Sequence, residues 1–445
     1  MESISSTIKL LFPRCVMAGI DLKDAYYHLP IHAEHQQYLR VAVTLEGKEL
    51  GWIVNFEKSR LNPETVQTFL GIQLDSVSQK CFLPQSKRLT IQSKVSDAIR
   101  KPYMTLRKAM SLLGSLSSCI PAVPWAQFHT RQLQYEVLSA QGKDGYLESR
   151  ITLSSNVLES LSWWLDMDHL SRGVPWIIDP SKIITTDASP IGWGAHMEDN
   201  LAQNTWGQTE LICSSNWKEL KAIECALYHF LPQIHGTNVR IYSDNSTAVA
   251  YLNRQGGTKS GSLMTIAANI FQLAEAHLTS LTALHIKGVE NIRADYLSRN
   301  ELRQGEWTLN KSIFRRITEA WGIPQIDLFA TRDNRQVQRF ASLNTRDHPD
   351  MLDSLHHPWR FRLAYAFPPM SLIPLVIRKI RREQARVILI APFWPKRPWF
   401  SCLQTMCLCD PWILPSDKEL LYQGPFFHPQ VKGLHLTAWN LRGNY

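Results

Sequence analysis

The chain has 445 residues, of which 44% are hydrophobic and 20% are charged, a composition ordinary for folded globular protein. This length predicts about two to four domains, each with enough chain to bury a core. The formal net charge of +9 favours an acidic polymer as a partner, although charge alone does not identify one.

The eight cysteines show no pairable framework, which is typical of a reducing compartment. The sequence contains neither a signal-peptide pattern at its start nor an apolar run of the roughly eighteen residues that a membrane helix needs. We therefore expect an intracellular protein of the cytoplasm or nucleus, neither secreted nor bound to a membrane.

The segment from Met17 to Ile31 predicts a strand, an acidic turn and a short helix. Asp21 or Asp24 can simply cap that helix. The segment also resembles the first catalytic motif of a retroelement reverse transcriptase, and this resemblance implies that Asp21 is its metal-binding aspartate.

The polymerase pattern breaks between Leu50 and Gly51, because the segment that follows resembles palm sequence from beyond a Tyr-x-Asp-Asp hairpin that the chain does not contain. Nucleotidyl transfer needs at least two carboxylates to hold both metal ions, and Asp21 alone does not suffice. We expect residues 1–85 to be a truncated palm and fingers remnant, inactive in DNA synthesis. The break near 50/51 is either a genuine deletion or a gene-model artefact.

Residues 86–175 are expected to form thumb and connection helices. Before them, Phe69–Asp75 and Cys81–Pro84 predict a pair of strands. Basic residues are interleaved along the helical segment, where they could follow a nucleic-acid backbone. A solvated helix face explains them equally well.

Four acidic residues carry the functional interpretation of the central segment. Asp187 and Asp244 each end a predicted strand, Glu219 lies in an amphipathic helix, and Asp295 begins a terminal helix. Singly, each is as well explained as a cap or a solvated side chain. If they converge, a cation must offset their repulsion. Hard oxygen ligands favour Mg²⁺ or Mn²⁺, and such a cluster suits two-metal phosphodiester hydrolysis.

The order of these pieces resembles a ribonuclease H domain of retroelement type. The matching segments are Thr186–Ser189, Glu219–Ile223, Ser243–Asn245 and Ala294–Arg299. The resemblance implies a mixed five-stranded sheet with flanking helices over residues 176–300. It also implies that the four carboxylates hold two Mg²⁺ or Mn²⁺ ions, that the RNA strand of an RNA/DNA hybrid is cleaved, and that His285 assists product release.

Four polar residues near the predicted strand ends are candidates for substrate contacts: Ser189, Asn245, Arg254 and Gln255. The ribonuclease H family reads a hybrid by its shape, through 2′-hydroxyls and phosphates. A solvated loop explains Arg254 and Gln255 nearly as well, and Ser189 is equally placed to form an ST-turn.

Residues 301–445 predict a small α/β domain, since helical and strand patterns alternate along them. They include a helix from Ser312 to Trp321, a basic helix from Leu375 to Arg386 and a strand from Arg386 to Pro392.

The order of these elements resembles a phage-type DNA adenine methyltransferase. The resemblance implies that Asp327 lies near S-adenosylmethionine and that Pro368 and Pro369 are remains of the catalytic loop. Phe367 and Met370 stand where that family has its Asp or Asn and its aromatic residue. We therefore expect no methyl transfer, and a nucleic-acid-binding or structural role instead.

The succession of polymerase, nuclease and methyltransferase-like parts resembles the DIRS-type retrotransposon polyprotein over nearly the whole chain. The leading hypothesis is a retrotransposon-derived ribonuclease H whose partners are RNA/DNA hybrids and other nucleic acids, with no membrane partner. The alternatives are a non-catalytic nucleic-acid-binding relic and a DNA adenine methyltransferase, which Phe367 disfavours.

Overall fold

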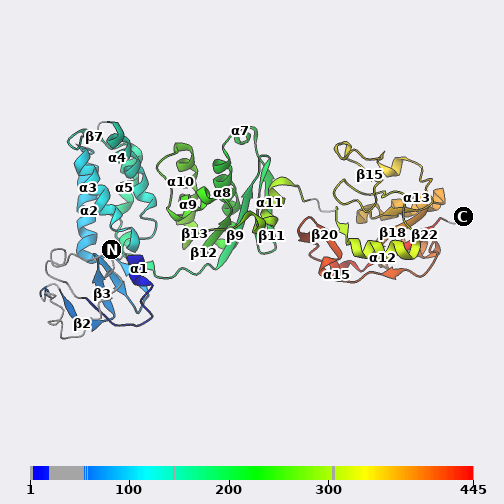
Figure 1. The fold of residues 1–445 in the computed structure, drawn as a ribbon, viewed down its shortest axis with the longest axis horizontal. Helices are drawn as coiled ribbons and strands as arrows, with labels where there is room; N and C mark the ends of the chain where they lie inside the picture. The colour runs from blue at the N-terminus through cyan, green and yellow to red at the C-terminus, as the bar shows by residue number, and fades with distance from the viewer. Residues whose placement is uncertain are drawn as a thin grey trace, which may run out of the picture. The chain divides into compact units, whose positions relative to one another are not determined.

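The computed structural model describes residues 4–19, 55, 57, 59–143, 146–302 and 306–443. Asp21 and the sequence break at 50/51 lie outside these residues, so the predictions about the polymerase remnant stay predictions. The chain forms two compact units, which divide between Asn291 and Ile292, and each is described by itself below (Figure 1).

The first part of unit 1 is a small antiparallel sheet whose residues share one hydrophobic core with a helix bundle. The strands, in the order β3-β4-β5-β8, are β3 (Val66–Phe69), β4 (Ile72–Asp75), β5 (Lys80–Phe82) and β8 (Val174–Pro175). The main helices are α2 (Gln85–Arg100), α3 (Leu106–Ser117), α4 (Arg131–Lys143) and α5 (Ser155–Ser162).

The predicted pairing is confirmed, since β4 and β5 are antiparallel neighbours, but the first strand begins at Ile72 and not at Phe69, which ends β3. The preceding hairpin, β3 to β4, turns at Leu70 and Gly71, whose φ angles are 50° and 72°. Two consecutive positive φ angles give the turn the twist that flanking strands require, and glycine adopts such an angle without steric cost.

The second part of unit 1 is a mixed five-stranded sheet, as the resemblance implied. The strands, in the order β11-β10-β9-β12-β13, are β9 (Lys182–Ala188), β10 (Gly192–Met197), β11 (Asn200–Thr205), β12 (Asn238–Ser243) and β13 (Ser280–His285). Strands β9, β10 and β11 are antiparallel neighbours, whereas β12 is parallel to both β9 and β13.

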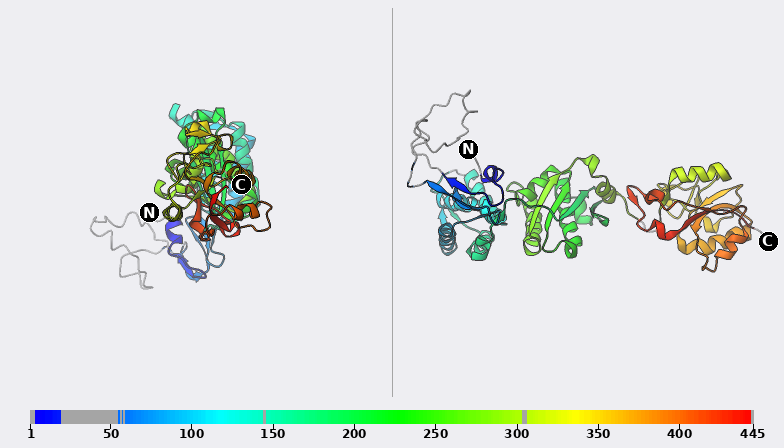
Figure 2. Two further views of the ribbon diagram at one scale, coloured as in Figure 1. Left: turned by 90° about the vertical axis from the view of Figure 1, so that its right-hand side faces the viewer. Right: turned by 90° about the horizontal axis from the view of Figure 1, so that it is seen from below.

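Three helices pack with this sheet: α8 (Ser215–Ile234), α9 (Ser246–Asn253) and α10 (Gly261–His277). A polar residue directly before each helix accepts a backbone N–H through its side chain: Ser214, Asn245 and Ser260. Such N-caps explain where the helices begin. Helix α8 lies against β9 and β10, α10 lies against α8, and α9 lies against β12 and β13. Figure 2 shows this sheet and its helices, in green, from two further sides.

Unit 2 begins with α11 (Ile292–Arg299) and is built around a four-stranded sheet. The strands, in the order β17-β18-β22-β19, are β17 (Ala364–Ala366), β18 (Arg386–Pro392), β22 (Leu436–Arg442) and β19 (Trp412–Ile413). Helix α12 (Lys311–Trp321) agrees with the predicted helix to within one residue, and β18 has the predicted bounds. Helix α13 (Ile373–Glu383) begins before the predicted Leu375 and ends before the predicted Arg386, because Gln384 adopts a left-handed conformation with φ of 54°.

The two helices of unit 2 cover opposite faces of this sheet. Val387 and Leu389 of β18 share a core with Ile377 of α13, whereas Ile388 shares a different core with Ile317 of α12. Alternate residues of a strand point to opposite faces, so α12 and α13 sandwich the sheet.

None of the helices in the described part of the chain combines the length and apolar character that crossing a bilayer requires.

Candidate active site

Two aspartates meet because their strands are parallel neighbours. Thr185 of β9 is the register partner of Tyr242 of β12, so the two strands end at the same edge of the sheet. Asp187 is the penultimate residue of β9, and Asp244 directly follows β12. This topology places both carboxylates at one edge.

Helix α8 adds the third carboxylate. Ser214 fixes the start of α8 by accepting from Trp217 N at 3.3 Å, and Glu219 follows in the second turn. Oxygen atoms of Asp187, Glu219 and Asp244 all lie within 4.8 Å of one another. Asp187 is 4% exposed and Glu219 is 5% exposed, so water screens their repulsion poorly.

The electrostatic consequence falls on Glu219. Burial, followed by the nearby charges of Asp187 and Asp244, raises the pKa of Glu219 to about 9. Among the described residues, Glu219 Oε2 is buried and has no hydrogen-bond partner. A buried acceptor without a donor, among further carboxylate oxygens, fits a hard divalent cation such as Mg²⁺ or Mn²⁺.

The predicted fourth ligand, Asp295, belongs to unit 2. It lies within α11, where its Oδ1 accepts from Arg299 Nε at 2.7 Å. Its assignment as a metal ligand stays a prediction.

Asn291 is a site residue that the sequence analysis did not single out. Its side chain is 1% exposed, and its Nδ2 donates to Thr186 O at 3.1 Å and to Asp187 Oδ1 at 3.3 Å. The amide therefore holds the end of β9 and the Asp187 carboxylate together. A polar residue in the loop between His285 and Asp295 was the available signal, but local sequence does not reveal burial.

His285 lies beside Asp244 at the exposed side of the site. Its Nε2 donates to the Asp244 carbonyl oxygen at 2.9 Å, and its ring is exposed. The following loop passes close to the same residue, because a methyl group added at Gly288 would lie 3.3 Å from Asp244 Oδ2. The predicted part of His285 in product release is untested.

Two predicted substrate residues have clear structural contacts. Ser189 Oγ accepts from Ile191 N at 3.2 Å and from Gly192 N at 3.1 Å. These are the contacts of an ST-turn, the alternative role that the sequence left open for Ser189. Asn245 Oδ1 accepts from Ala248 N at 2.8 Å and thereby caps α9. A substrate contact by either residue stays a prediction.

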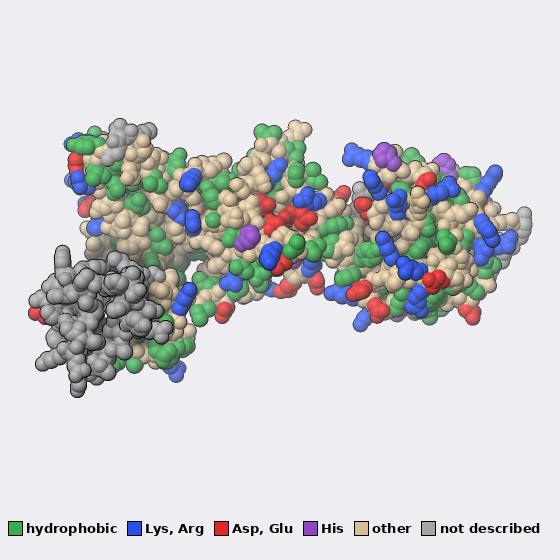
Figure 3. Space-filling model, viewed as in Figure 1, with side chains coloured by type: hydrophobic (Ala, Val, Ile, Leu, Met, Phe, Trp, Pro, Cys, Tyr) green, Lys and Arg blue, Asp and Glu red, His purple; other side chains and the backbone are tan. Residues whose placement is uncertain are grey.

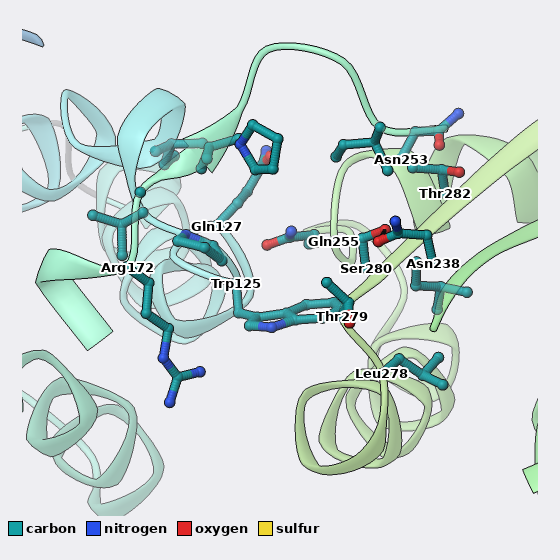
Figure 4. Close-up of a pocket in the computed structure, with 18 of the residues that line it drawn as sticks. Trp125, Gln127, Arg172, Asn238, Asn253, Gln255, Leu278, Thr279, Ser280 and Thr282 are labelled. Carbon is teal, nitrogen blue, oxygen red and sulfur yellow. Dashed lines mark hydrogen bonds between the residues drawn. The ribbon is translucent and has the colours of Figure 1, made fainter. Parts of the chain in front are cut away.

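Gln255 and Arg254 join the sheet to the helix bundle. Gln255 Oε1 accepts from Phe128 N at 3.0 Å, and the Arg131 guanidinium donates to the Arg254 carbonyl oxygen. Gln255 and Trp125 line a cavity of about 620 Å³ between the bundle and the β12–β13 side of the sheet, and both side chains point into it (Figure 4). The Gln255 side chain thus serves docking within unit 1, whereas the exposed Arg254 side chain remains a predicted substrate contact.

A second junction between the bundle and the sheet part centres on Glu275 of α10. Its carboxylate accepts from Trp163 Nε1 at 2.6 Å and lies 2.7 Å from His129 Nε2, while the His129 and Trp163 rings stack at 4.2 Å. None of the three acidic residues Asp187, Glu219 and Asp244 lines the 620 Å³ cavity, so this cavity belongs to the junction between bundle and sheet. Below, these three residues are called the carboxylate cluster.

In unit 2, Asp327 is 2% exposed and fully engaged with backbone. Its Oδ1 accepts from Phe329 N at 3.3 Å and its Oδ2 from Gln336 N at 3.0 Å. Burial raises the pKa of Asp327 to about 7. These contacts hold the loop from Phe329 to Gln336 in place.

Pro368 is buried, while Pro369 lines a cavity of about 580 Å³ together with Phe329 and Phe367. The loop that Asp327 fixes thus forms part of this cavity wall. Whether the cavity relates to S-adenosylmethionine is untested, and Phe367 offers no polar group to a substrate.

The sequence matches no protein-family model and no curated protein. Among solved structures it is similar to LC11 ribonuclease H1 in complex with an RNA/DNA hybrid, with 21% identity, a TM-score of 0.24, and coverage of 26% of this chain and 93% of that chain. For ribonuclease H1 from the halophilic archaeon Halobacterium salinarum the values are 19%, 0.23, 26% and 92%.

A foamy viral protease–reverse transcriptase in complex with an RNA/DNA hybrid is similar over 68% of this chain, with 15% identity and a TM-score of 0.31. This chain spans 48% of the length of that viral chain. At these TM-scores the similarities carry no weight for the activity of this chain.

Proposed function

We propose that this chain is a retroelement-derived ribonuclease H that hydrolyses the RNA strand of RNA/DNA hybrids with the help of divalent cations. The observation that carries the proposal is the meeting of Asp187, Glu219 and Asp244 within 4.8 Å, with a buried oxygen of Glu219 left without a donor. A purely structural role for these three side chains is disfavoured, because their carboxylates repel one another in a poorly hydrated site, and without a cation the fold must hold Glu219 protonated.

The proposal assigns each residue a task. Asp187, Glu219 and Asp244, with Asp295 as the predicted fourth ligand, would hold two Mg²⁺ or Mn²⁺ ions. When bound, such ions lower the pKa of an attacking water and stabilise the charge on the leaving oxygen. Asn291 would keep Asp187 oriented through its 3.3 Å contact.

The remaining parts of the chain are proposed to be vestiges. Asp21 stands without a second polymerase carboxylate in the sequence, so DNA synthesis is not expected. The Phe367 side chain cannot accept a hydrogen bond from an adenine amino group, so methyl transfer is not expected either. The succession of the three parts supports an origin in a DIRS-type retrotransposon.

The test is a cleavage assay on a hybrid whose RNA strand carries an end label, with Mg²⁺ or Mn²⁺ and with EDTA as the control. We expect internal cuts in the RNA strand that leave 3′-hydroxyl and 5′-phosphate ends, and no cuts with EDTA or in single-stranded RNA. Binding of the hybrid without cleavage under either ion would favour the non-catalytic relic. Incorporation of labelled methyl groups into DNA, measured in parallel, would contradict the vestigial assignment of Phe367.

A further inference from the structure

The net charge of the chain lies entirely in unit 2. Residues 292–445 contain 22 Lys and Arg against 13 Asp and Glu, a net charge of +9, which equals that of the whole chain. Residues 1–291 are therefore neutral overall. Of the 22 basic residues, 17 are arginines, and Figure 3 shows basic side chains spread over the visible face of this unit.

One cavity of unit 2 is walled by arginine. It has a volume of about 450 Å³ and is lined by Arg362 and Arg386 together with Trp321, Gln325 and Leu363. Arg386 begins β18, and Leu363 directly precedes β17, so the cavity lies at the amino ends of these strands. The cavity that Phe367 and Pro369 line lies past the carboxyl end of β17 and is distinct from it.

The arginines of this cavity have no counter-charge. Arg386 is the cross-strand partner of Arg442 in the antiparallel pair of β18 and β22, and like charges placed directly opposite destabilise a sheet. Within the described residues, Arg362, Arg386 and Arg442 form no ion pair. Arg386 Nε is also buried without a hydrogen-bond partner there.

Neighbouring cations on α13 show the opposite pattern. Glu383 accepts from Lys379 Nζ at 2.6 Å and from Arg382 Nη2 at 3.2 Å. Unit 2 thus neutralises basic side chains where an acid is at hand, while the cavity arginines keep their donors available.

We propose that this cavity binds a phosphate group of a nucleic-acid strand. The guanidinium group presents a planar fork of donors that matches phosphate oxygens, and a phosphate would relieve the Arg386–Arg442 repulsion. The indole of Trp321 adds an apolar wall at which a sugar or base next to that phosphate can rest. This site does not depend on the proposed nuclease activity.

A membrane surface is the less suitable partner. Basic amphipathic helices bind bilayers by inserting an apolar face, whereas Ile317 of α12 and Ile373, Val376 and Ile380 of α13 are buried in the protein core.

A structural explanation competes with the proposal. The carboxyl end of α12, at Trp321, carries a partial negative charge of about half an elementary charge, which nearby arginines stabilise. This accounts for one cation near the helix end. It does not account for the second arginine of the cavity, or for the buried Arg386 Nε that lacks an acceptor.

The test measures binding of the full-length chain to a fluorescein-labelled DNA duplex of about twenty base pairs, by anisotropy over a series of salt concentrations. The variant is R362Q/R386Q. Its matched control is R378Q/R381Q, two exposed arginines of α13 on the other face of the sheet, which change the net charge equally. The parent chain and both variants carry D187N, so that no nuclease activity can degrade the nucleic-acid probe.

We expect R362Q/R386Q to weaken duplex binding about tenfold and to lower the slope of log K against log salt by about one, because the cavity holds one phosphate and each phosphate contact contributes roughly 0.9. The control pair should change affinity less than about threefold, since it alters only the overall field. Inorganic phosphate, added as a competitor, should displace the duplex from the parent chain more readily than from R362Q/R386Q.

Three results would overturn the proposal. The first is an equal loss of binding in both pairs, which means diffuse attraction without a site. The second is a lower melting temperature for R362Q/R386Q with unchanged duplex binding, which assigns the arginines to the helix end. The third is arginine-dependent binding to phosphatidylserine vesicles without binding to the duplex. Failure of the nuclease assay with retained duplex binding would leave this site standing, because D187N is present throughout.

Discussion

The two units each bury an aspartate next to a strand, yet the surroundings of the two carboxylates differ. Asp187 in unit 1 is 4% exposed and meets Glu219 and Asp244 within 4.8 Å. Asp327 in unit 2 is 2% exposed, and both of its oxygens accept backbone N–H groups. The two aspartates are therefore buried to nearly the same degree, although Asp187 lies within β9 and Asp327 forms only isolated bridges, to Phe340 and to Tyr365 of β17.

What separates the two sites is the balance of donors and acceptors. Around Asp327 two donors satisfy one carboxylate, so the group is complete and fixes a loop. In the cluster of Asp187, Glu219 and Asp244 in unit 1, by contrast, Glu219 Oε2 lacks a hydrogen-bond partner among the described residues. A cation can satisfy a buried acceptor that has no donor, so this difference supports the proposed metal site in unit 1 and a structural role for Asp327.

The largest expected effect comes from removing one negative charge from the carboxylate cluster of Asp187, Glu219 and Asp244. D187N should lower hybrid cleavage by at least about a thousandfold, equivalent to about 4 kcal/mol of activation free energy. The fold should remain, because the substitution preserves shape and relieves repulsion on Glu219. Cleavage rates and circular dichroism measure the two outcomes.

The matched control is D327N in unit 2, which removes the same charge from an equally buried position. It should leave the cleavage rate unchanged. Full activity in D187N, or equal losses in both variants, would refute the assignment of the carboxylate cluster as the active site.

The second effect concerns the orientation of Asp187. N291A removes the donor to Asp187 Oδ1, and a hydrogen bond to a charged group contributes about 1.5–3 kcal/mol. We expect kcat to fall about 10- to 100-fold, the Mg²⁺ concentration for half-maximal activity to rise, and KM for the hybrid to stay constant. A rise in KM with constant kcat would instead place Asn291 in substrate binding.

A smaller effect is expected for the stability of unit 2. In D327N an amide nitrogen replaces one acceptor, so one of the N–H groups of Phe329 and Gln336 loses its partner. An unsatisfied buried donor costs about 1–3 kcal/mol of unfolding free energy. Hydrogen exchange should accelerate over residues 328–336 and not over β9 or β12. Unchanged exchange there would mean that Asp327 does not hold this loop.

Periodicity placed three of the four acidic residues on the correct elements, whereas their convergence was implied by the resemblance to ribonuclease H. Asp187 and Asp244 end strands that the apolar pattern marks, and Glu219 lies in a helix with a clear polar cap at Ser214. Parallel neighbouring strands then bring the two aspartates to one edge.

Contacts between distant segments could not be predicted in the same way. The hydrogen bond from Phe128 N to Gln255 Oε1 joins residues 127 positions apart. Because nothing near Gln255 in the sequence marks this contact, its surroundings have the pattern of a solvated loop. The contact of Asn291 with Asp187 spans 104 positions. The hydrogen bonds that Asp327 accepts from backbone N–H groups are likewise a tertiary feature, and the methyltransferase resemblance linked that residue only to a cofactor.

The smallest effect, and the sharpest separation of the two units, is in the pH dependence of stability without and with Mg²⁺. The pKa of Glu219 is raised from 4.5 to about 9, so the folded state holds this proton more tightly than the unfolded state. Its stabilising contribution is complete below about pH 4.5 and is lost as pH rises towards 9. For Asp327 the corresponding interval runs from 3.8 to about 7.

Between pH 7 and 9, therefore, Glu219 should continue to lower the free energy of unfolding as pH rises, whereas Asp327 should not. A divalent cation must displace the Glu219 proton, so its affinity should increase over the same interval. At ten times its Kd the cation should stabilise the folded state by about 1.4 kcal/mol.

Calorimetry at pH 6, 7, 8 and 9, with Mg²⁺ or EDTA, should show that Mg²⁺ raises the melting temperature more as pH rises. E219Q should abolish both the pH trend above 7 and the gain from Mg²⁺, whereas D327N should leave both intact. A gain from Mg²⁺ that persists in E219Q would place the cation elsewhere.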